Sequence, residues 1–263
     1  MVKPETFIKA SNILAYLLFL TVNIIWGLGL KEEESPHSHQ SMSTYISPAI
    51  FTFYIWAVIH LFLAGFVVYQ LFEARVEVLV NGIQWHFVGV TLLSVLCLAL
   101  WQEDLILVAW IVIIVATWQI SVIYWTLKKK YLPQDKYETL FIHIPFSLYH
   151  AWILVSTLLT TFASFTPNVK NDRGPTLIVL IFVILGLVLM EVAAIVYIEI
   201  FKDIAGASII AWTLFGIAVE QTDLVIHWTA LVLMVACTLH IFKPYIMKMI
   251  CKDGSNKKFS FFK

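Results

Sequence analysis

The chain has 263 residues, of which 60% are hydrophobic and only 13% charged, and its mean hydropathy is +0.87. A soluble domain carries about 25% charged residues, so this chain has too few charges to cover a water-facing surface. This excludes an ordinary soluble enzyme, a disordered chain and a nucleic-acid-binding domain. The 17 basic and 17 acidic side chains cancel, and the composition predicts an all-α, polytopic helix bundle in the lipid bilayer.

Eight apolar runs have the length, or nearly the length, of about 20 residues that a helix needs to cross the hydrocarbon core. They cover residues 11–30, 46–73, 85–101, 105–127, 140–165, 176–200, 205–220 and 224–247. The third and seventh runs are short for a full span, so they would either cross the bilayer steeply or borrow residues from their flanking turns. Ser47-Pro48 opens the second run and Gly174-Pro175 the sixth, because proline is tolerated in a first helical turn. Lys243-Pro244 lies near the end of the eighth run.

The distribution of charge predicts the orientation of these eight transmembrane helices. If the N-terminus is cytoplasmic, 14 of the 17 basic residues lie in inner segments, and only Lys31, Lys170 and Arg173 lie outside. Cytoplasmic loops of membrane proteins carry this excess of lysine and arginine. We therefore expect both termini in the cytoplasm and one membrane domain over residues 1–263. Its basic tail, residues 248–263, is expected to be a solvated anchor, with binding of anionic lipid as the alternative.

Ionisable side chains within the spans are candidates for function, because burying a charge costs several kcal/mol. Glu191 lies in the middle of the sixth run. It is either a proton-coupled or ligand-contacting carboxyl, or a neutral carboxyl bonded to a neighbouring helix. His60, His143 and His150 raise the same choice, since neutral histidines often form hydrogen bonds between membrane helices.

Polar and aromatic residues form stripes on three of the predicted helices. The fifth run places His143, Ser147, His150, Thr157 and Thr161 on one face, and the fourth does the same with Trp110, Thr117, Ser121 and Tyr124. Phe53, Trp56 and His60 share a face of the second run. Such stripes should face the bundle rather than lipid. They predict either an amphipathic pocket or ordinary helix packing.

Catalytic and metal-binding motifs are absent from the sequence. It contains no nucleophile motif, Walker loop, Rossmann glycine pattern or HExxH, so we expect a protein that is not an enzyme. The three cysteines have no metal-ligand spacing, and we expect no metal site. A haem held by two histidines, taken from His60, His150 and His240, is an open alternative because all three lie within predicted spans.

Three stretches of the chain resemble a known family. They are Ser47–Gln70 in the second run, Ile144–Ser164 in the fifth and Ala211–Gln221 in the seventh. The Pro-x-x-x-x-Phe-x-x-Trp pattern appears as Pro48, Phe53 and Trp56, and the fifth run carries Pro145, Phe146 and Trp152. These features are similar to the longer, eight-span members of the tryptophan-rich sensory protein family. That family is related to the translocator protein, or peripheral benzodiazepine receptor.

The resemblance implies a five-helix translocator-like bundle over residues 11–165, followed by three additional helices over residues 166–247. Ligands of the family are hydrophobic: tetrapyrroles such as porphyrin and haem, sterols and synthetic drugs. They are proposed to bind between the helices near the outer end of the second span. The sequence departs from the pattern at His60, where a tyrosine is expected. It departs again at Thr160 and Thr161, where an asparagine is expected, and no sterol-recognition motif closes the fifth run.

The sequence therefore predicts a multi-pass membrane protein that binds or senses a hydrophobic small molecule, with translocation as an extension of that role. Porphyrin or haem would be a ligand rather than a firmly bound cofactor. The residues expected to contact the ligand are Pro48, Phe53, Trp56, His60, Trp110, Tyr124, His143, Ser147, His150, Trp152 and Glu191. The alternative is a proton-coupled transporter or channel that uses Glu191 and the histidines. Small residues at Ala207 and Ala211, and at Thr160 and Ser164, allow close helix contact within one chain or in a homo-oligomer.

Overall fold

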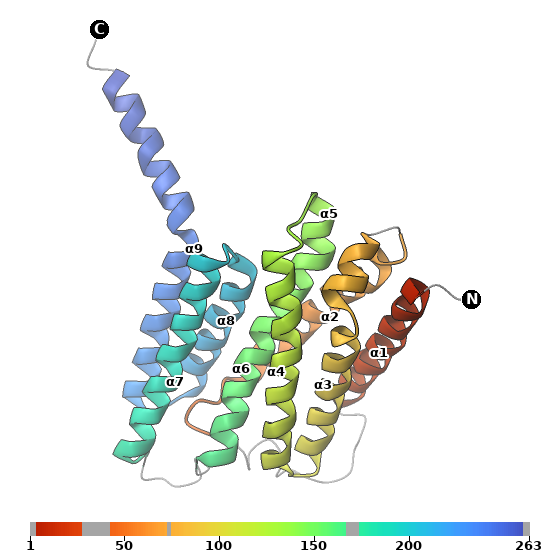
Figure 1. The fold of residues 1–263 in the computed structure, drawn as a ribbon. Coiled ribbons are helices and arrows are strands. Elements are labelled where there is room, and N and C mark those ends of the chain that lie inside the picture. Colours follow the sequence, from red (N-terminus) through yellow and green to blue (C-terminus); the bar gives the residue numbers. More distant parts are fainter. Residues whose placement is uncertain (1–3, 28–42, 73–74, 167–173, 260–263) are drawn as a thin grey trace.

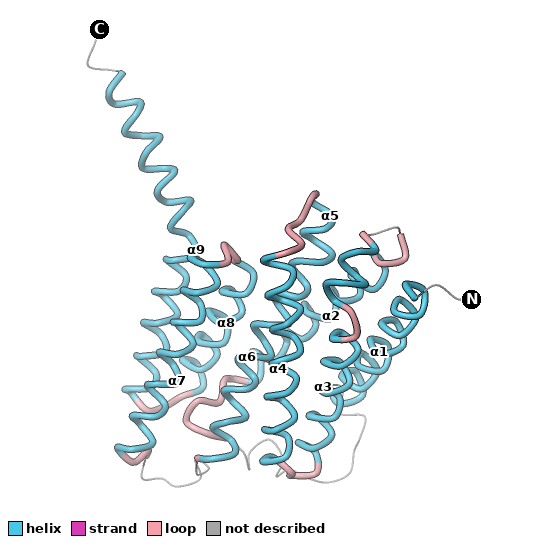
Figure 2. Tube along the Cα trace, viewed as in Figure 1, coloured by secondary structure: helices cyan, strands magenta, loops and turns pink. Residues whose placement is uncertain are grey.

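The structure, a computed structural model, describes residues 4–27, 43–72, 75–166 and 174–259, and the side chains of these except for residue 4 and residues 244–259. Every regular element within these ranges is helical (Figure 2). The elements are α1 (Pro4–Gly27), η1 (Ile50–Tyr54), α2 (Ile55–Tyr69), η2 (Val78–Ile83), α3 (His86–Gln102), α4 (Ile106–Lys129), α5 (Lys136–Glu138), η3 (Thr139–His143), α6 (Ile144–Phe165), α7 (Leu177–Ile195), η4 (Val196–Ile200), α8 (Ile204–Glu220) and α9 (Leu224–Phe259).

The helices agree with the apolar runs of the sequence. Six helical segments among the described residues are long and apolar enough to cross a membrane: Glu5–Trp26, Ile50–Tyr69, Ile106–Lys129, Lys136–Phe165, Leu177–Ile200 and Leu224–Lys243. The other two, α3 and α8, are shorter apolar helices and correspond to the two runs that are short in the sequence. The protein is thus a multi-pass helical membrane protein, and the total of eight spans stays a prediction.

Several helix boundaries differ from the expected ones. Helix α1 starts at Pro4 rather than near residue 11, and Pro175 lies before α7, which starts at Leu177. Pro48 precedes the second helix instead of lying in its first turn, because the chain enters through the 3₁₀ segment η1 before α2 starts at Ile55. The eighth predicted span was expected to end near Pro244, but α9 continues to Phe259. A proline removes one backbone donor, and the turns that follow it restore the helical hydrogen bonds. The C-terminal half of α9 extends beyond the bundle (Figure 1).

Five helices form a closed ring in the order α1, α2, α6, α4, α3, with α3 returning to α1. The ring is closed because each helix contacts the next one in this order, which differs from the order of the helices along the chain. The interior of this helix ring contains aromatic side chains. Among them is Phe66, which packs edge-on against Phe87 of α3 and Phe146 of α6 at centroid distances of 5.2 and 4.9 Å. These aromatic side chains give the centre of the five-helix ring a closely packed, apolar interior.

The remaining helices α7, α8 and α9 pack on one another, and α8 joins them to the ring through α6 and η1 (Figure 1). The contact with η1 is made by backbone and side-chain donors: Ala49 N donates to Gly216 O at 3.0 Å, and Trp212 Nε1 donates to Thr52 O at 3.0 Å. Gln221 Nε2 reaches Ser47 O at 2.7 Å. The end of α8 therefore fixes the entry of the chain into α2.

We call the two ends of the bundle by their charge. The basic end holds the α4–α5 connection, the turn at residues 201–203 and Lys243, and the first turn of α1 and the extension of α9 point the same way (Figure 1). The acidic end holds Glu103, Asp104, Glu220 and Asp223. This separation of charge fits an even number of crossings.

Candidate functional site

An aromatic cluster lies between α1, α2 and α6, in the half of the ring nearer the acidic end. At its centre Trp56 stacks on His60 at 5.4 Å with an interplanar angle of 28°, and it meets Trp152 of α6 edge-on at 6.0 Å. Phe19 of α1 contacts both Trp56 and His60, at 5.5 and 4.8 Å. Tyr149 of α6 lies 6.2 Å from Trp56. Three helices thus place a continuous set of rings around one indole.

Three polar atoms within this cluster have no hydrogen-bond partner among the residues that the structure describes. They are Nδ1 and Nε2 of His60 and Nε1 of Trp152, all inaccessible to solvent. His60 is 7% exposed and Trp152 is 1% exposed. Buried polar atoms are almost always hydrogen-bonded in native proteins, and each unsatisfied one costs about 1–3 kcal/mol. The cluster therefore combines apolar stacking surface with unused donors and acceptors, which is the composition of a site for an amphipathic ligand.

The cluster is held by hydrogen bonds at Tyr16 and Tyr149 and reaches the surface at Phe53. Tyr16 donates to the backbone oxygen of His60 at 2.8 Å, and the hydroxyl of Tyr149 pairs with Ser94 Oγ of α3 at 2.8 Å. Phe53, which packs edge-on against Trp152 at 5.8 Å, is 44% exposed. Access to the site is therefore easiest past Phe53 and the half-buried Trp56.

The polar stripes of α4 and α6 face each other and pair along the helix seam. Trp110 Nε1 donates to Thr161 Oγ1 at 3.0 Å, and the hydroxyls of Thr117 and Thr157 lie 2.6 Å apart. The prediction that these stripes face the bundle is confirmed. The residues satisfy one another, however, so the stripes form a seam between two helices rather than the wall of a pocket.

His150 continues this seam toward the basic end. Its Nε2 pairs with Ser121 Oγ at 3.0 Å, its Nδ1 pairs with the hydroxyl of Tyr197 at 2.5 Å, and Tyr124 stacks on its ring at 4.3 Å with an interplanar angle of 8°. Both ring nitrogens are occupied. His150 therefore behaves as a histidine bonded between helices, the simpler of the two interpretations drawn from the sequence.

Asp203 joins the ring to α8 at the basic end. Its Oδ1 caps α8 by accepting from Gly206 N at 3.3 Å. Its Oδ2 receives Lys128 Nζ at 2.9 Å, the hydroxyl of Tyr124 at 2.8 Å and that of Ser147 at 2.6 Å. The side chain of Asp203 is 4% exposed and that of Lys128 17%. One carboxylate thus connects α4, α6 and α8.

The charge of Asp203 is stabilised by these partners. Burial alone would raise the pKa of Asp203, but the Lys128 ammonium and the hydroxyls of Ser147 and Tyr124 together hold this pKa below its ordinary value. Asp203 is therefore ionised at neutral pH. The preceding Lys202 has a φ of +52°, an unfavourable conformation for a residue other than glycine, and this turn brings the carboxylate over the start of α8.

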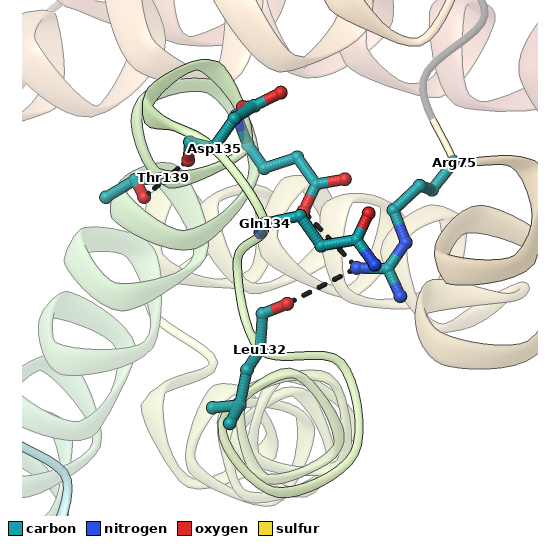
Figure 3. Close-up of polar contacts among 6 residues, drawn as sticks. Arg75, Leu132, Gln134, Asp135 and Thr139 are labelled. Atoms are coloured by element: carbon teal, nitrogen blue, oxygen red, sulfur yellow. Dashed lines mark hydrogen bonds and ion pairs between the residues drawn. The ribbon is translucent and has the colours of Figure 1, made fainter.

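A second buried ion pair closes the ring at the basic end (Figure 3). Arg75 Nη1 lies 3.3 Å from Glu138 Oε2 and also donates to Leu132 O at 3.3 Å. The same carboxylate oxygen accepts from Gln134 N at 2.8 Å. Asp135 caps the short helix α5 by accepting from Glu138 N at 2.7 Å. These contacts hold the segment after α2 against the segment after α4.

His143 lies buried between the two ion pairs, in the π-helical turn η3 that leads into α6. It interacts electrostatically with Lys128 and Asp203 of one pair and with Arg75 and Glu138 of the other. Its surroundings are charged and tightly bonded. His143 thus belongs to the basic end of the five-helix ring, and among the described residues no aromatic contact joins it to the aromatic cluster.

Comparison with known proteins places the chain in a family. A family model described as TSPO-like protein matches residues 9–243. The chain belongs to the TSPO-like protein family. No curated protein and no solved structure matches it significantly. Membership confirms the resemblance drawn from the second, fifth and seventh runs, and it supports the assignment as a multi-pass integral membrane protein of the TSPO type.

In this TSPO-like protein the predicted contact residues separate into three groups. Phe53, Trp56, His60 and Trp152 come together in the aromatic cluster, and Pro48 lies buried just before η1, against Gly216. Trp110, Tyr124, Ser147, His150 and His143 lie along the α4–α6 seam and at the basic end. The residues that were expected to line one pocket thus lie in separate parts of the structure.

Glu191 forms the third group, away from the ring. It is 9% exposed on α7, and its Oε2 is buried without a hydrogen-bond partner in the described ranges of the chain. It interacts electrostatically with Cys237 and His240 of α9. It therefore belongs to the three additional helices of this TSPO-like protein.

Sequence reasoning missed several residues of these groups. Phe19 and Tyr149 carry no signal beyond aromaticity in apolar runs. Asp203 has a recognisable signal, because an aspartate three residues before Gly206 at a helix start is a capping position. Its pairing with Lys128 has none, since the two are far apart in the sequence.

The arrangement does not offer two histidines with free ring nitrogens that could hold a haem. His150 uses both ring nitrogens, and His240 gives Nε2 to Glu199 Oε1 at 2.7 Å. Of the three candidates, only His60 has two ring nitrogens without a hydrogen-bond partner among the described residues. The described residues contain no group of three or more His, Cys, Asp or Glu side chains suited to a metal ion.

Proposed function

We propose that this protein is a non-enzymatic membrane receptor for a flat hydrophobic ligand of the tetrapyrrole type, bound in the aromatic cluster. One observation carries the proposal: the ring nitrogens of His60 and the indole N–H of Trp152 are buried and unsatisfied among stacked rings. A ligand that stacks on Trp56 and presents a carboxylate or another acceptor would satisfy the indole N–H of Trp152 and the imidazole N–H of His60. Family membership supports a protein of the TSPO type.

A tetrapyrrole fits this chemistry better than a sterol. Its macrocycle offers a planar π-surface to Trp56 and Phe53, and its carboxylate side chains accept hydrogen bonds from an indole or imidazole N–H. A sterol offers one hydroxyl and no π-surface. The half-buried Trp56 would turn aside to admit the ligand past Phe53. Translocation would follow if the same ligand could leave toward the basic end, where Arg75–Glu138 and Lys128–Asp203 close the ring.

The binding test uses purified full-length protein and protoporphyrin, followed by the quenching of tryptophan fluorescence and the porphyrin absorption spectrum. Trp152→Phe keeps the ring and removes only the N–H, so we expect affinity to fall about tenfold, the effect of one hydrogen bond in a buried site. His60→Leu should have a similar or larger effect. Trp56→Ala should weaken binding further, since it removes stacking area.

Matched controls separate the site from general effects. Trp118 is 60% exposed on α4, so Trp118→Phe should leave the affinity unchanged. His227 bonds to Ala218 O at 2.6 Å, within the three additional helices, and His227→Gln should also have no effect. If the His60 and Trp152 variants bind porphyrin as tightly as the natural protein, the aromatic cluster is not the ligand site. Preference for cholesterol over porphyrin would replace the tetrapyrrole by a sterol.

A further inference from the structure

Glu191 differs from the buried carboxyls of Glu138 and Asp203, because no ion pair involves it in the described part of the chain. It lies in α7 about two and a half helical turns before the end of this span at Ile200. Its side chain is 9% exposed, and Oε2 is fully buried with no hydrogen-bond partner in the described part of the chain. An ionised carboxylate without partners is very costly in such surroundings. The group must therefore carry a proton or acquire a positively charged partner.

The elements around Glu191 offer one such partner. Of the helices packed on α7, α9 presents Cys237 and His240, which share a face because they are three residues apart, and both interact electrostatically with Glu191. Helix α8 has no titratable side chain between its cap and Glu220 at the far end. On the same chain segment, η4 adds Tyr197, which is bonded to His150, and Glu199. His240 is therefore the group that can respond to the charge of Glu191.

A series of titratable groups connects this position with the basic end. His240 Nε2 pairs with Glu199 Oε1 at 2.7 Å, and the same oxygen receives Lys243 Nζ at 3.0 Å. The exposed fraction of the side chains rises along the series, from 21% for His240 to 42% for Glu199 and 61% for Lys243. Such a gradient leads from a buried carboxyl to the exposed surface at the basic end, as in the chains of ionisable groups that relay protons in membrane proteins.

We propose that Glu191 is a proton-binding site that exchanges with the basic end of the bundle through His240 and Glu199. No hydrogen bond joins Glu191 to His240 among the described residues, so the transfer requires the Glu191 side chain to turn toward α9. The proton then leaves the Glu191 carboxyl and binds to the imidazole of His240 at Nδ1, the ring nitrogen that Glu199 does not use. His240 then releases the proton at Nε2 to the Glu199 carboxylate, from which water removes it. The neutral pair and the pair of carboxylate and imidazolium have the same net charge, so the first step moves a proton without adding charge to the interior.

The proposal is independent of the ligand site. The aromatic cluster lies in the five-helix ring, whereas Glu191, His240 and Glu199 belong to the three additional helices. Loss of porphyrin binding would leave the proton site untouched, and loss of the proton site would leave porphyrin binding untouched. The two can therefore be tested separately on the same preparation.

The test is labelling by dicyclohexylcarbodiimide, a hydrophobic reagent that modifies protonated carboxyls in apolar surroundings. Full-length protein in liposomes is labelled over a pH series, and the modified residue is located by mass spectrometry. We expect Glu191 to be labelled at low pH and labelling to fall as pH rises through one midpoint. Glu191→Gln should remove this label. In His240→Gln the midpoint should move up by about one pH unit, because the positive partner that favours the ionised form is lost.

His227→Gln, on the same helix α9 but bonded to Ala218 O, is the matched control and should leave the midpoint unchanged. The pH series on the natural protein needs no variant, so the test stands even if Glu191→Gln does not fold. Absence of label at Glu191 at every pH, or labelling independent of pH, overturns the proton site. A midpoint that is the same in His240→Gln and in the natural protein overturns the relay.

Discussion

At Gly216 the backbone of α8 lies directly against Thr52 of η1. A Cβ at this position would overlap the Thr52 hydroxyl and press on Pro48. Gly216→Ala should therefore destabilise the protein by about 1–3 kcal/mol, the cost of overpacking a close contact. Because η1 leads into α2, it should also weaken porphyrin binding at Trp56. The measurements are the Tm in detergent at a fixed scan rate and the porphyrin affinity.

Gly89 provides the control for this substitution. A Cβ at Gly89 would meet Gln119 at 3.4 Å or more, an ordinary contact, and alanine is a better helix former than glycine within α3. Gly89→Ala should therefore leave the Tm unchanged or raise it. A Gly216→Ala protein with the Tm of the natural chain would show that α8 and η1 are not in close contact.

Asp203 acts at the scale of elements, because its carboxylate joins α4, α6 and α8. Asp203→Asn leaves Lys128 without its partner in a largely buried position and should cost about 3 kcal/mol. The folded-state pKa of Asp203 lies below its unfolded value of about 3.9. The resulting stability is present above that value and is lost as pH falls through the folded pKa.

The measurement is therefore the Tm of both proteins between about pH 6 and pH 3. The natural protein should lose Tm more steeply below about pH 4 than Asp203→Asn, and the two curves should converge. Glu199→Gln breaks ion pairs in which Glu199 is 42% exposed, and exposed pairs contribute little, so its Tm should change little at neutral pH. Parallel pH curves for the natural protein and Asp203→Asn would contradict the role given to Asp203.

The helices and their inward faces could be predicted from the sequence, but their partners could not. The 3.6-residue period places Thr117 and Ser121 on one face of α4, and Thr157 and His150 on one face of α6, and the structure confirms that both faces point into the bundle, where they meet each other. Periodicity does not say which helix lies opposite. This is why residues expected to line a pocket turned out to satisfy one another.

The same limit applies to the candidate site. Phe53 and Trp56 could be singled out from a motif at the head of the second run, and His60 from its depth in that run. The unsatisfied state of His60 and Trp152 depends on what surrounds them in three dimensions, and no sequence pattern records it. The small residues Ala207 and Thr160 were predicted to allow close contact, and both are buried within the chain.

At the scale of the whole molecule, the separation of charge predicts the orientation in the membrane. Lys128, Lys202 and Lys243 all lie at the basic end, toward which the first turn of α1 and the extension of α9 also point (Figure 1). Translocation of lysine-rich segments is disfavoured, so the basic end should face the cytoplasm with both termini. The test is a short epitope tag at either terminus, probed with antibody in intact and permeabilised cells.

Both terminal tags should react only after permeabilisation. The control is the same tag between Glu103 and Asp104, in the turn that joins α3 and α4 at the acidic end, which should react in intact cells. Reaction of one terminal tag but not the other in intact cells would mean an odd number of crossings, and the short helices α3 and α8 would then be the first to re-examine as spans. Reaction of both terminal tags in intact cells would mean that the orientation is the opposite one. The series from Glu191 to Lys243 would then lead to the outer side of the membrane.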